Sequence, residues 1–78
     1  MNAADADQRI ILSRHTLKRY GQLTTIGQSA THEDVLLIDK ELEILDAIAA
    51  QFPEKVPKLL RLVAEWLTFR DRIQVTLH

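Results

Sequence analysis

Residues 35–52 have the sequence VLLIDKELEILDAIAAQF. Apolar side chains recur in this stretch at alternating spacings of three and four, at Val35, Ile38, Leu42, Leu45, Ala49 and Phe52. This period matches one face of an α-helix. Thr31 and Asp34 form a capping-box pattern before the stretch, and Pro53 follows it. We therefore expect a helix over residues 33–52.

A second amphipathic stretch follows after a short connection. Pro57 suits a first helical turn, and we expect a helix over residues 57–76. Its inner stripe consists of Leu59, Leu62, Val63, Trp66, Phe69, Ile73 and Leu77. So short a connection makes the two helices antiparallel neighbours. One register then pairs apolar residues at five levels: Phe52 with Leu59, Ala49 with Leu62, Leu45 with Trp66, Leu42 with Phe69, and Ile38 with Ile73.

The N-terminal segment predicts a shorter helix over residues 4–20. Its inner side consists of Ala6, Ile10, Ser13, Leu17 and Tyr20. Gly21 stands where a C-terminal cap belongs, and residues 22–30 are polar enough for a loop. A β-strand over residues 9–13 is the alternative, because the short apolar run at residues 10–12 has no decisive period.

The sequence as a whole predicts an all-α fold in which residues 1–78 form one small domain, a helical hairpin with the N-terminal helix packed across it. A domain of this size buries only about 60% of the surface of its unfolded chain. Further apolar side chains flank the two inner stripes, at Leu36, Leu37, Ile44, Ile48, Leu60, Leu67 and Val75. We expect this surplus to pack hairpin on hairpin in a homodimeric helical bundle. The alternative is that the N-terminal helix, with Leu23 and Ile26, covers it.

Two charged residues fall inside the apolar arcs of the predicted hairpin. Glu41 and Arg70 share one level of the register. A charge on an apolar face is costly unless it is paired, so we predict a Glu41–Arg70 ion pair, within the chain or across an interface. Exposure of both charged ends to water is the alternative. The predicted partner or dimer interface comprises Leu37, Glu41, Ile44, Ile48, Leu60, Leu67 and Arg70.

Charge is unevenly distributed along the chain. Residues 33–54 carry seven acidic side chains and one basic side chain, whereas both flanking segments are basic and the net charge is −1. The acidic helix argues against nucleic acid as the main partner. A small nucleic-acid-associated regulator that uses Arg14, Lys18 and Arg19 is the alternative function.

The sequence contains no motif that specifies chemistry. Its three histidines, His15, His32 and His78, lie in different segments, and there is no cysteine, phosphate-binding loop or calcium loop. The longest apolar run, residues 35–38, is far too short to span a membrane. We expect no catalytic residue, metal or cofactor, and no membrane contact. The predicted function is that of a cytoplasmic, non-catalytic module that binds another protein or regulates it.

Residues 31–46, THEDVLLIDKELEILD, resemble the second helix of the small sporulation-regulating aspartyl-phosphate phosphatases. That family has a helical hairpin with a Ser-Gln-Glu-Leu-Asp core. The corresponding stretch here is Asp39-Lys40-Glu41-Leu42-Glu43, in which the Ser, the Gln and the Asp of the motif are all replaced. The resemblance implies a modulator of a response-regulator-like partner.

Overall fold

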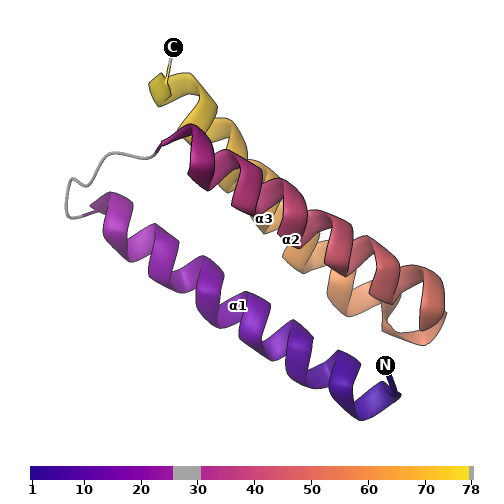
Figure 1. The fold of residues 1–78 in the computed structure, drawn as a ribbon. Helices are drawn as coiled ribbons and strands as arrows, with labels where there is room; N and C mark the ends of the chain where they lie inside the picture. The colour runs from indigo at the N-terminus through magenta and orange to yellow at the C-terminus, as the bar shows by residue number, and fades with distance from the viewer. Residues whose placement is uncertain (26–30, 78) are drawn as a thin grey trace.

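The computed structural model describes residues 1–25 and 31–77, and the side chains of residues 1–22 and 31–73. These residues form three α-helices and one 3₁₀ turn: α1 (Ala3–Thr25), α2 (His32–Gln51), η1 (Pro53–Lys55) and α3 (Val56–Leu77) (Figure 1). The all-α prediction is confirmed, since the described residues include no strand and residues 9–13 are helical.

Helix α1 is longer at both ends than the sequence predicts. At its start, the Asp5 backbone N–H donates to Asn2 Oδ1 at 2.8 Å and the Asn2 N–H donates to Asp5 Oδ2 at 3.3 Å, a reciprocal cap. At its other end, the predicted cap at Gly21 is wrong, because the helix continues to Thr25. Glycine permits a helix to end but does not force it to end. A glycine inside a helix lowers helix stability by about 1 kcal/mol relative to alanine, and α1 tolerates this loss. Residues 26–30 of the predicted loop lie outside the described residues.

The ends of α2 follow the local signals in the sequence. The Thr31 N–H donates to Asp34 Oδ2 at 2.8 Å, and the Asp34 N–H donates to Thr31 Oγ1 at 3.4 Å, so the predicted capping box is confirmed. Phe52 caps the C-terminal end, and Pro53 opens the turn η1. Helix α3 then begins at Val56, one residue before the predicted start.

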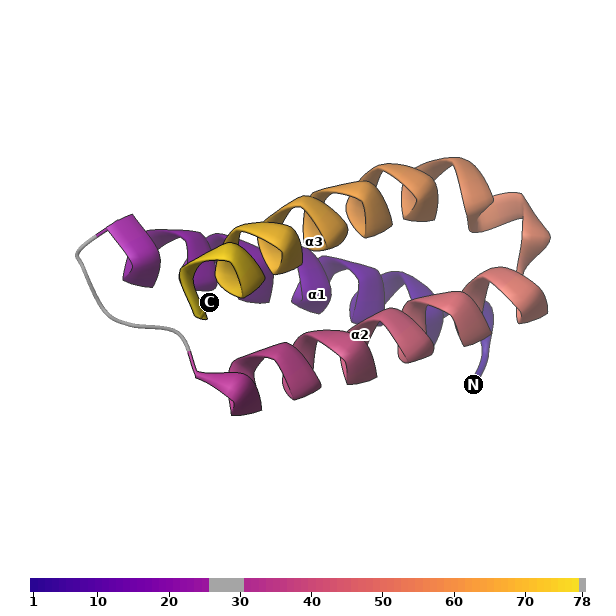
Figure 2. The ribbon, with the colours of Figure 1, turned by 90° about the horizontal axis from the view of Figure 1, so that it is seen from above.

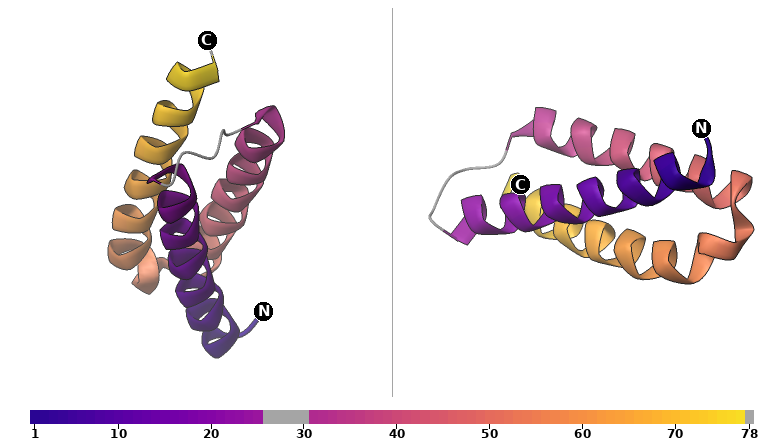
Figure 3. Two further views of the ribbon diagram at one scale, coloured as in Figure 1. Left: turned by 90° about the vertical axis from the view of Figure 1, so that its left-hand side faces the viewer. Right: turned by 90° about the horizontal axis from the view of Figure 1, so that it is seen from below.

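The three helices form a bundle in which α2 runs antiparallel to both α1 and α3 (Figure 1). Seen from above and from below, α1 lies along the space between α2 and α3, with its N-terminal end toward the turn η1 (Figures 2 and 3). The molecule measures 37 × 20 × 19 Å. Because a helix with its side chains is about 10–12 Å across, every helix keeps one side in contact with solvent.

The core is formed by the inner stripes of all three helices. Its buried apolar residues are Ala6, Ile10, Ile38, Leu45, Ile48, Leu59, Leu62, Trp66, Phe69 and Ile73. Leu17 and Tyr20 are half-buried against it. The predicted roles of Leu23, Ile26, Val75 and Leu77 fall outside the residues whose side chains are described.

Trp66 lies at the centre of this core with 1% of its surface exposed. Its indole Nε1 donates to the Ser13 hydroxyl of α1 at 2.9 Å, and Ser13 is itself fully buried. The Tyr20 ring meets the indole edge to face, with the ring centroids 6.1 Å apart. Burial raises the pKa of the Tyr20 phenol, and the Asp34 carboxylate raises it further. Ser13, placed from the sequence on the inner side of the N-terminal helix, is thus the acceptor for the Trp66 indole N–H.

The N-terminal end of α1 is fastened to the turn between α2 and α3. Lys55 Nζ donates to Asp7 Oδ1 at 2.6 Å, and Gln51 Nε2 donates to the Met1 carbonyl at 3.1 Å. The hydrogen bond from Lys55 lowers the pKa of Asp7. Because the folded-state pKa lies below the unfolded one, this contribution to stability is present at neutral pH and is lost as the pH falls through the folded-state pKa.

We expect Ser13→Ala to lower the free energy of unfolding by about 1–3 kcal/mol, because the Trp66 indole would keep its burial and lose its acceptor. Urea unfolding followed by Trp66 fluorescence measures this loss. Thr16→Ala is the matched control, since the Thr16 hydroxyl donates only to the Leu12 carbonyl of its own helix. Its effect should stay within about 0.5 kcal/mol. Equal losses in the two variants would contradict the assigned role of Ser13.

Candidate functional site

An apolar groove runs between α2 and α3, on the side of this helix pair that α1 does not cover. Its volume is about 310 Å³, and we refer to it as the α2/α3 groove. It is lined by Leu42, Leu45, Asp46 and Ala49 of α2 and by Val56, Leu59, Leu60, Val63 and Leu67 of α3. Eight of these nine residues are aliphatic, so the groove offers a surface for apolar side chains and few polar groups for orienting a small substrate.

Two leucines of α3 are the large hydrophobic side chains of this groove that are exposed to solvent. Leu60 is 65% exposed and Leu67 is 45% exposed. They are seven residues apart, two turns of one helix, and therefore lie on the same side of α3. Both belong to the interface predicted from sequence, and the structure brings them together.

The other apolar members of the predicted interface lie elsewhere. Ile48 is only 2% exposed and Ile44 is half-buried against the core, so neither offers much surface to a partner. Leu37 is 53% exposed but does not line the α2/α3 groove. Leu42 and Val63, which do line it, were assigned from sequence to the core alone. Periodicity could not separate these roles, because it locates an apolar arc and does not say which helix covers each part of it.

The predicted Glu41–Arg70 ion pair is wrong in its partners. Glu41 Oε2 accepts from Arg9 Nη2 of α1 at 2.6 Å, and Arg70 donates to both carboxylate oxygens of Asp39, at 2.6 and 3.4 Å. The sequence register considered only the helical hairpin. Helix α1 packs on the side of α2 that carries Glu41, so the Glu41 carboxylate pairs with Arg9 of α1 and not with Arg70 of α3.

The Arg9–Glu41 pair lies at the edge of the core. The Glu41 side chain is 13% exposed and that of Arg9 is 25% exposed. Glu41 Oε1 is buried and has no hydrogen-bond partner among the described residues. The carboxylate therefore depends on Arg9 for most of the compensation of its desolvation.

The α2 side of the groove carries an acidic edge, formed by Asp39, Glu43 and Asp46. These residues are spaced i, i+4 and i+7 and so share one face of α2. Asp39 is paired with Arg70, whereas no ion pair between described residues involves Glu43 or Asp46. The uncompensated negative charge of this edge thus lies beside the exposed leucines of α3.

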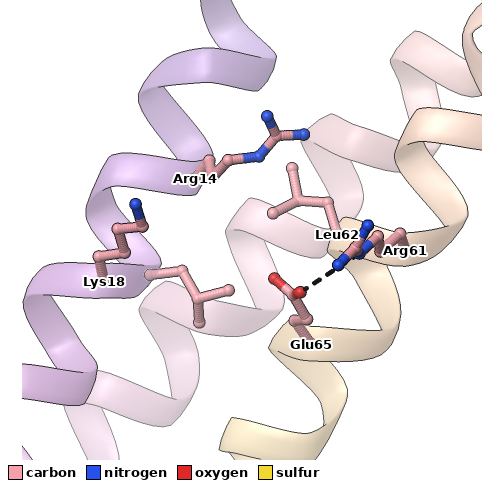
Figure 4. A pocket seen from close by; sticks show the side chains of 6 residues that line it. Arg14, Lys18, Arg61, Leu62 and Glu65 are labelled. Atoms are coloured by element: carbon pink, nitrogen blue, oxygen red, sulfur yellow. Dashed lines mark ion pairs between the residues drawn. The ribbon is translucent and has the colours of Figure 1, made fainter.

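A second groove, of about 330 Å³, separates α1 from α3 and has a different character. Figure 4 shows Arg14 and Lys18 of α1 on one side and Arg61, Leu62 and Glu65 of α3 on the other. Leu17 of α1 also lines the groove. We refer to it as the α1/α3 groove. Arg61 and Glu65 form only a loose pair at 3.8 Å, and the Arg61 side chain is 88% exposed.

The α1/α3 groove brings together part of the predicted nucleic-acid set. Arg14 and Lys18 line it, whereas Arg19 is exposed and does not. Arg72 lines the continuation of the groove toward Gly21. The cations of α3 were not predicted for this site, because their meeting with α1 depends on the parallel packing of two helices far apart in sequence.

The described residues offer little for chemistry. Within the described part of the chain, no three His, Asp or Glu side chains come close enough to hold a metal ion. The Ser13 hydroxyl is buried and accepts from Trp66. Among the helices described, none has the length and apolar character that a membrane span requires.

A double-mutant cycle tests the observed ion pair against the predicted one. We expect Arg9→Ala and Glu41→Ala to show a coupling energy of about 0.5–3 kcal/mol in urea unfolding, because each removes the partner of a partly buried charge. The Glu41→Ala and Arg70→Ala cycle is the control and should be additive within about 0.5 kcal/mol. A larger coupling between Glu41 and Arg70 than between Glu41 and Arg9 would contradict the assignment.

The stretch that resembles the aspartyl-phosphate phosphatases is engaged within the fold. Asp39 and Glu41 pair with α3 and α1, and Leu42 packs on the core. The response-regulator-like partner stays a prediction. Comparisons of the chain with protein-family models, curated proteins and solved structures found no match.

Proposed function

We propose that the protein is a non-catalytic protein-binding module, acting as a structural or regulatory partner, whose docking surface is the α2/α3 groove. The observation that carries the proposal is the pair of exposed leucines on a continuous aliphatic lining, Leu60 and Leu67. Full burial of a leucine side chain stabilises a complex by about 1.5–3 kcal/mol. Two such side chains at the centre of a contact provide the apolar anchors that protein interfaces need.

The shape of the groove favours a helix as the docking element. Two antiparallel helices form its walls, and its lining residues lie between positions 42 and 49 of α2 and between positions 56 and 67 of α3. An amphipathic helix fits such a groove by placing residues i, i+3, i+4 and i+7 into it. The lining covers about two turns of α2 and about three turns of α3, which matches the two turns that such a set of positions occupies.

A specific observation favours nucleic-acid binding as the second candidate. Arg14, Lys18 and Arg61 border one groove, and cations on two helices can contact phosphates on a single duplex or strand. Glu65 lies among these cations, and the acidic edge of α2 lies beyond α3. Both negative charges weaken the attraction of this groove for phosphates. For this reason we place nucleic acid second.

The docking surface can be tested with a displayed library of amphipathic helical peptides, selected against the chain immobilised at low density so that copies cannot pair. We expect Leu67→Glu to weaken binding of the selected peptides at least tenfold, because a carboxylate in the apolar groove is desolvated without a partner. Leu12→Glu is the matched control, since Leu12 is an exposed leucine of α1 at 57% exposure. Peptides that bind both variants equally would overturn the α2/α3 groove as the docking surface.

The second candidate is tested by titrating the chain with generic duplex DNA at 20 and 200 mM salt. If the α1/α3 groove binds phosphates, the affinity should fall steeply with salt, and Arg14→Ala with Lys18→Ala should reduce the slope by about 2. Arg19→Ala, outside the groove, serves as the control. Absence of binding at 20 mM salt would remove this candidate.

A further inference from the structure

We propose that the α1/α3 groove is a second docking surface and that its occupant is an acidic amphipathic helix of another protein. The linings of this groove and of the α2/α3 groove share no residue. The inference therefore goes beyond the proposed function and does not depend on it. It is supported by the extent of the groove, the charge of its walls, the apolar residues of its lining and a glycine in the α1 wall.

The α1/α3 groove extends over several turns of both helices. It continues toward their C-terminal ends into a hollow of about 480 Å³. Four residues line both parts and make them one groove: Leu17, Lys18, Arg61 and Glu65. The whole lining covers residues 14–21 of α1 and residues 61–72 of α3, about two and three turns respectively. This length suits a docked helix that uses its positions i, i+3, i+4 and i+7.

Both walls of the groove carry cations. Arg14 and Lys18 lie one turn apart on the α1 wall, and both are exposed. Arg61 and Arg72 lie on the α3 wall, at opposite ends of its lining. Among the described residues, no ion pair involves Arg14 or Lys18, and Glu65 is the one acidic residue that lines the groove. The groove therefore attracts negative charge on both flanks of its occupant.

The rest of the lining is mainly apolar. Leu62 and Phe69 belong to the core, Leu17 packs against that core, and Ala64 is exposed. Burial against such a lining stabilises apolar side chains, whereas a phosphate group gains nothing from it. An occupant with an apolar stripe between two acidic flanks complements both the lining and the walls. A nucleic-acid backbone complements only the walls.

The position of Glu65 also favours a helix over nucleic acid. Its carboxylate lies among the cations of the groove and forms only a loose pair with Arg61 at 3.8 Å. Duplex DNA carries one negative charge per about 1.7 Å of its axis, so its phosphates cannot avoid this carboxylate. A peptide helix can place a neutral side chain opposite Glu65 and keep its acids beside the cations.

Gly21 opens the α1 wall of the groove. A Cβ at this position would meet no atom within 4 Å outside its own part of the helix. Alanine would therefore fit, and it would make the helix more stable than glycine does. The missing side chain instead leaves space next to Leu17 and Phe69. The backbone of a docked helix can approach α1 closely at such a glycine.

The charge of the groove can be tested with a designed peptide and the full chain. The probe is a fluorescent, stapled helix of about 14 residues, with leucines at i, i+3, i+4 and i+7 and glutamates on both flanks of this stripe. We expect Arg14→Glu with Lys18→Glu to weaken its binding at least tenfold in fluorescence anisotropy, because attraction becomes repulsion at two sites. Arg19→Glu with Lys40→Glu is the matched control, since it changes the net charge equally at two exposed residues outside the groove. A peptide with glutamine in place of every glutamate should bind the wild-type chain at least tenfold more weakly.

The shape of the groove can be tested at Gly21. We expect Gly21→Phe to weaken binding of the acidic peptide at least tenfold, because the added ring occupies the space next to Phe69. Gly21→Ala should bind nearly as well as the wild type. Circular dichroism and urea unfolding check that both variants are folded. A folded Gly21→Phe variant that binds as tightly as Gly21→Ala would overturn the inference.

Other outcomes identify a different occupant or a different site. Equal binding of the glutamate and glutamine peptides, or equal effects of the two double charge reversals, would overturn the inference. Loss of binding in Leu67→Glu alone would place the acidic peptide in the α2/α3 groove. Duplex DNA that binds more tightly than the peptide and displaces it would make nucleic acid the occupant. The peptide selection described for the α2/α3 groove is scored separately, so either proposal can fail without the other.

Discussion

The hydrogen bond from the Trp66 indole to the Ser13 hydroxyl determines how α1 lies on the other two helices. A buried indole N–H that lacks an acceptor is costly, and Ser13 provides that acceptor at one level of α1. With this level set, Asp7 reaches Lys55 and Arg9 reaches Glu41. The large ring also fills the centre of the three-helix bundle. The position of α1, and with it the character of the α1/α3 groove, depends on this contact.

The ion pairs of the bundle hold its helices in register more than they stabilise it. Arg9–Glu41, Lys55–Asp7 and Arg70–Asp39 each join two different elements at a margin of the core. Partly exposed pairs of this kind contribute little net free energy individually. Their geometry nevertheless excludes alternative registers, because a shift by one turn would leave a carboxylate such as Glu41 desolvated without its partner.

Helix α3 is the element on which both candidate surfaces depend. Leu60 and Leu67 face the α2/α3 groove, whereas Arg61 faces the α1/α3 groove. Adjacent residues thus serve opposite flanks of one helix, as the rotation of 100° per residue requires. This arrangement separates the apolar lining of the α2/α3 groove from the cationic side chains that border the α1/α3 groove.

The sequence by itself determined that the chain is helical, and it determined the capping of α2 at Thr31 and the end of α2 at Phe52. The signals for these features lie within a few neighbouring residues. It also predicted the core stripes, since helical periodicity places apolar residues on one side. Only the tertiary structure decided the partner of Glu41, the role of Ser13 and the continuation of α1 through Gly21. It also decided which exposed leucines share a groove. These features depend on contacts between helices that are far apart in sequence, and the energy of such a contact is not encoded in the local pattern of either helix.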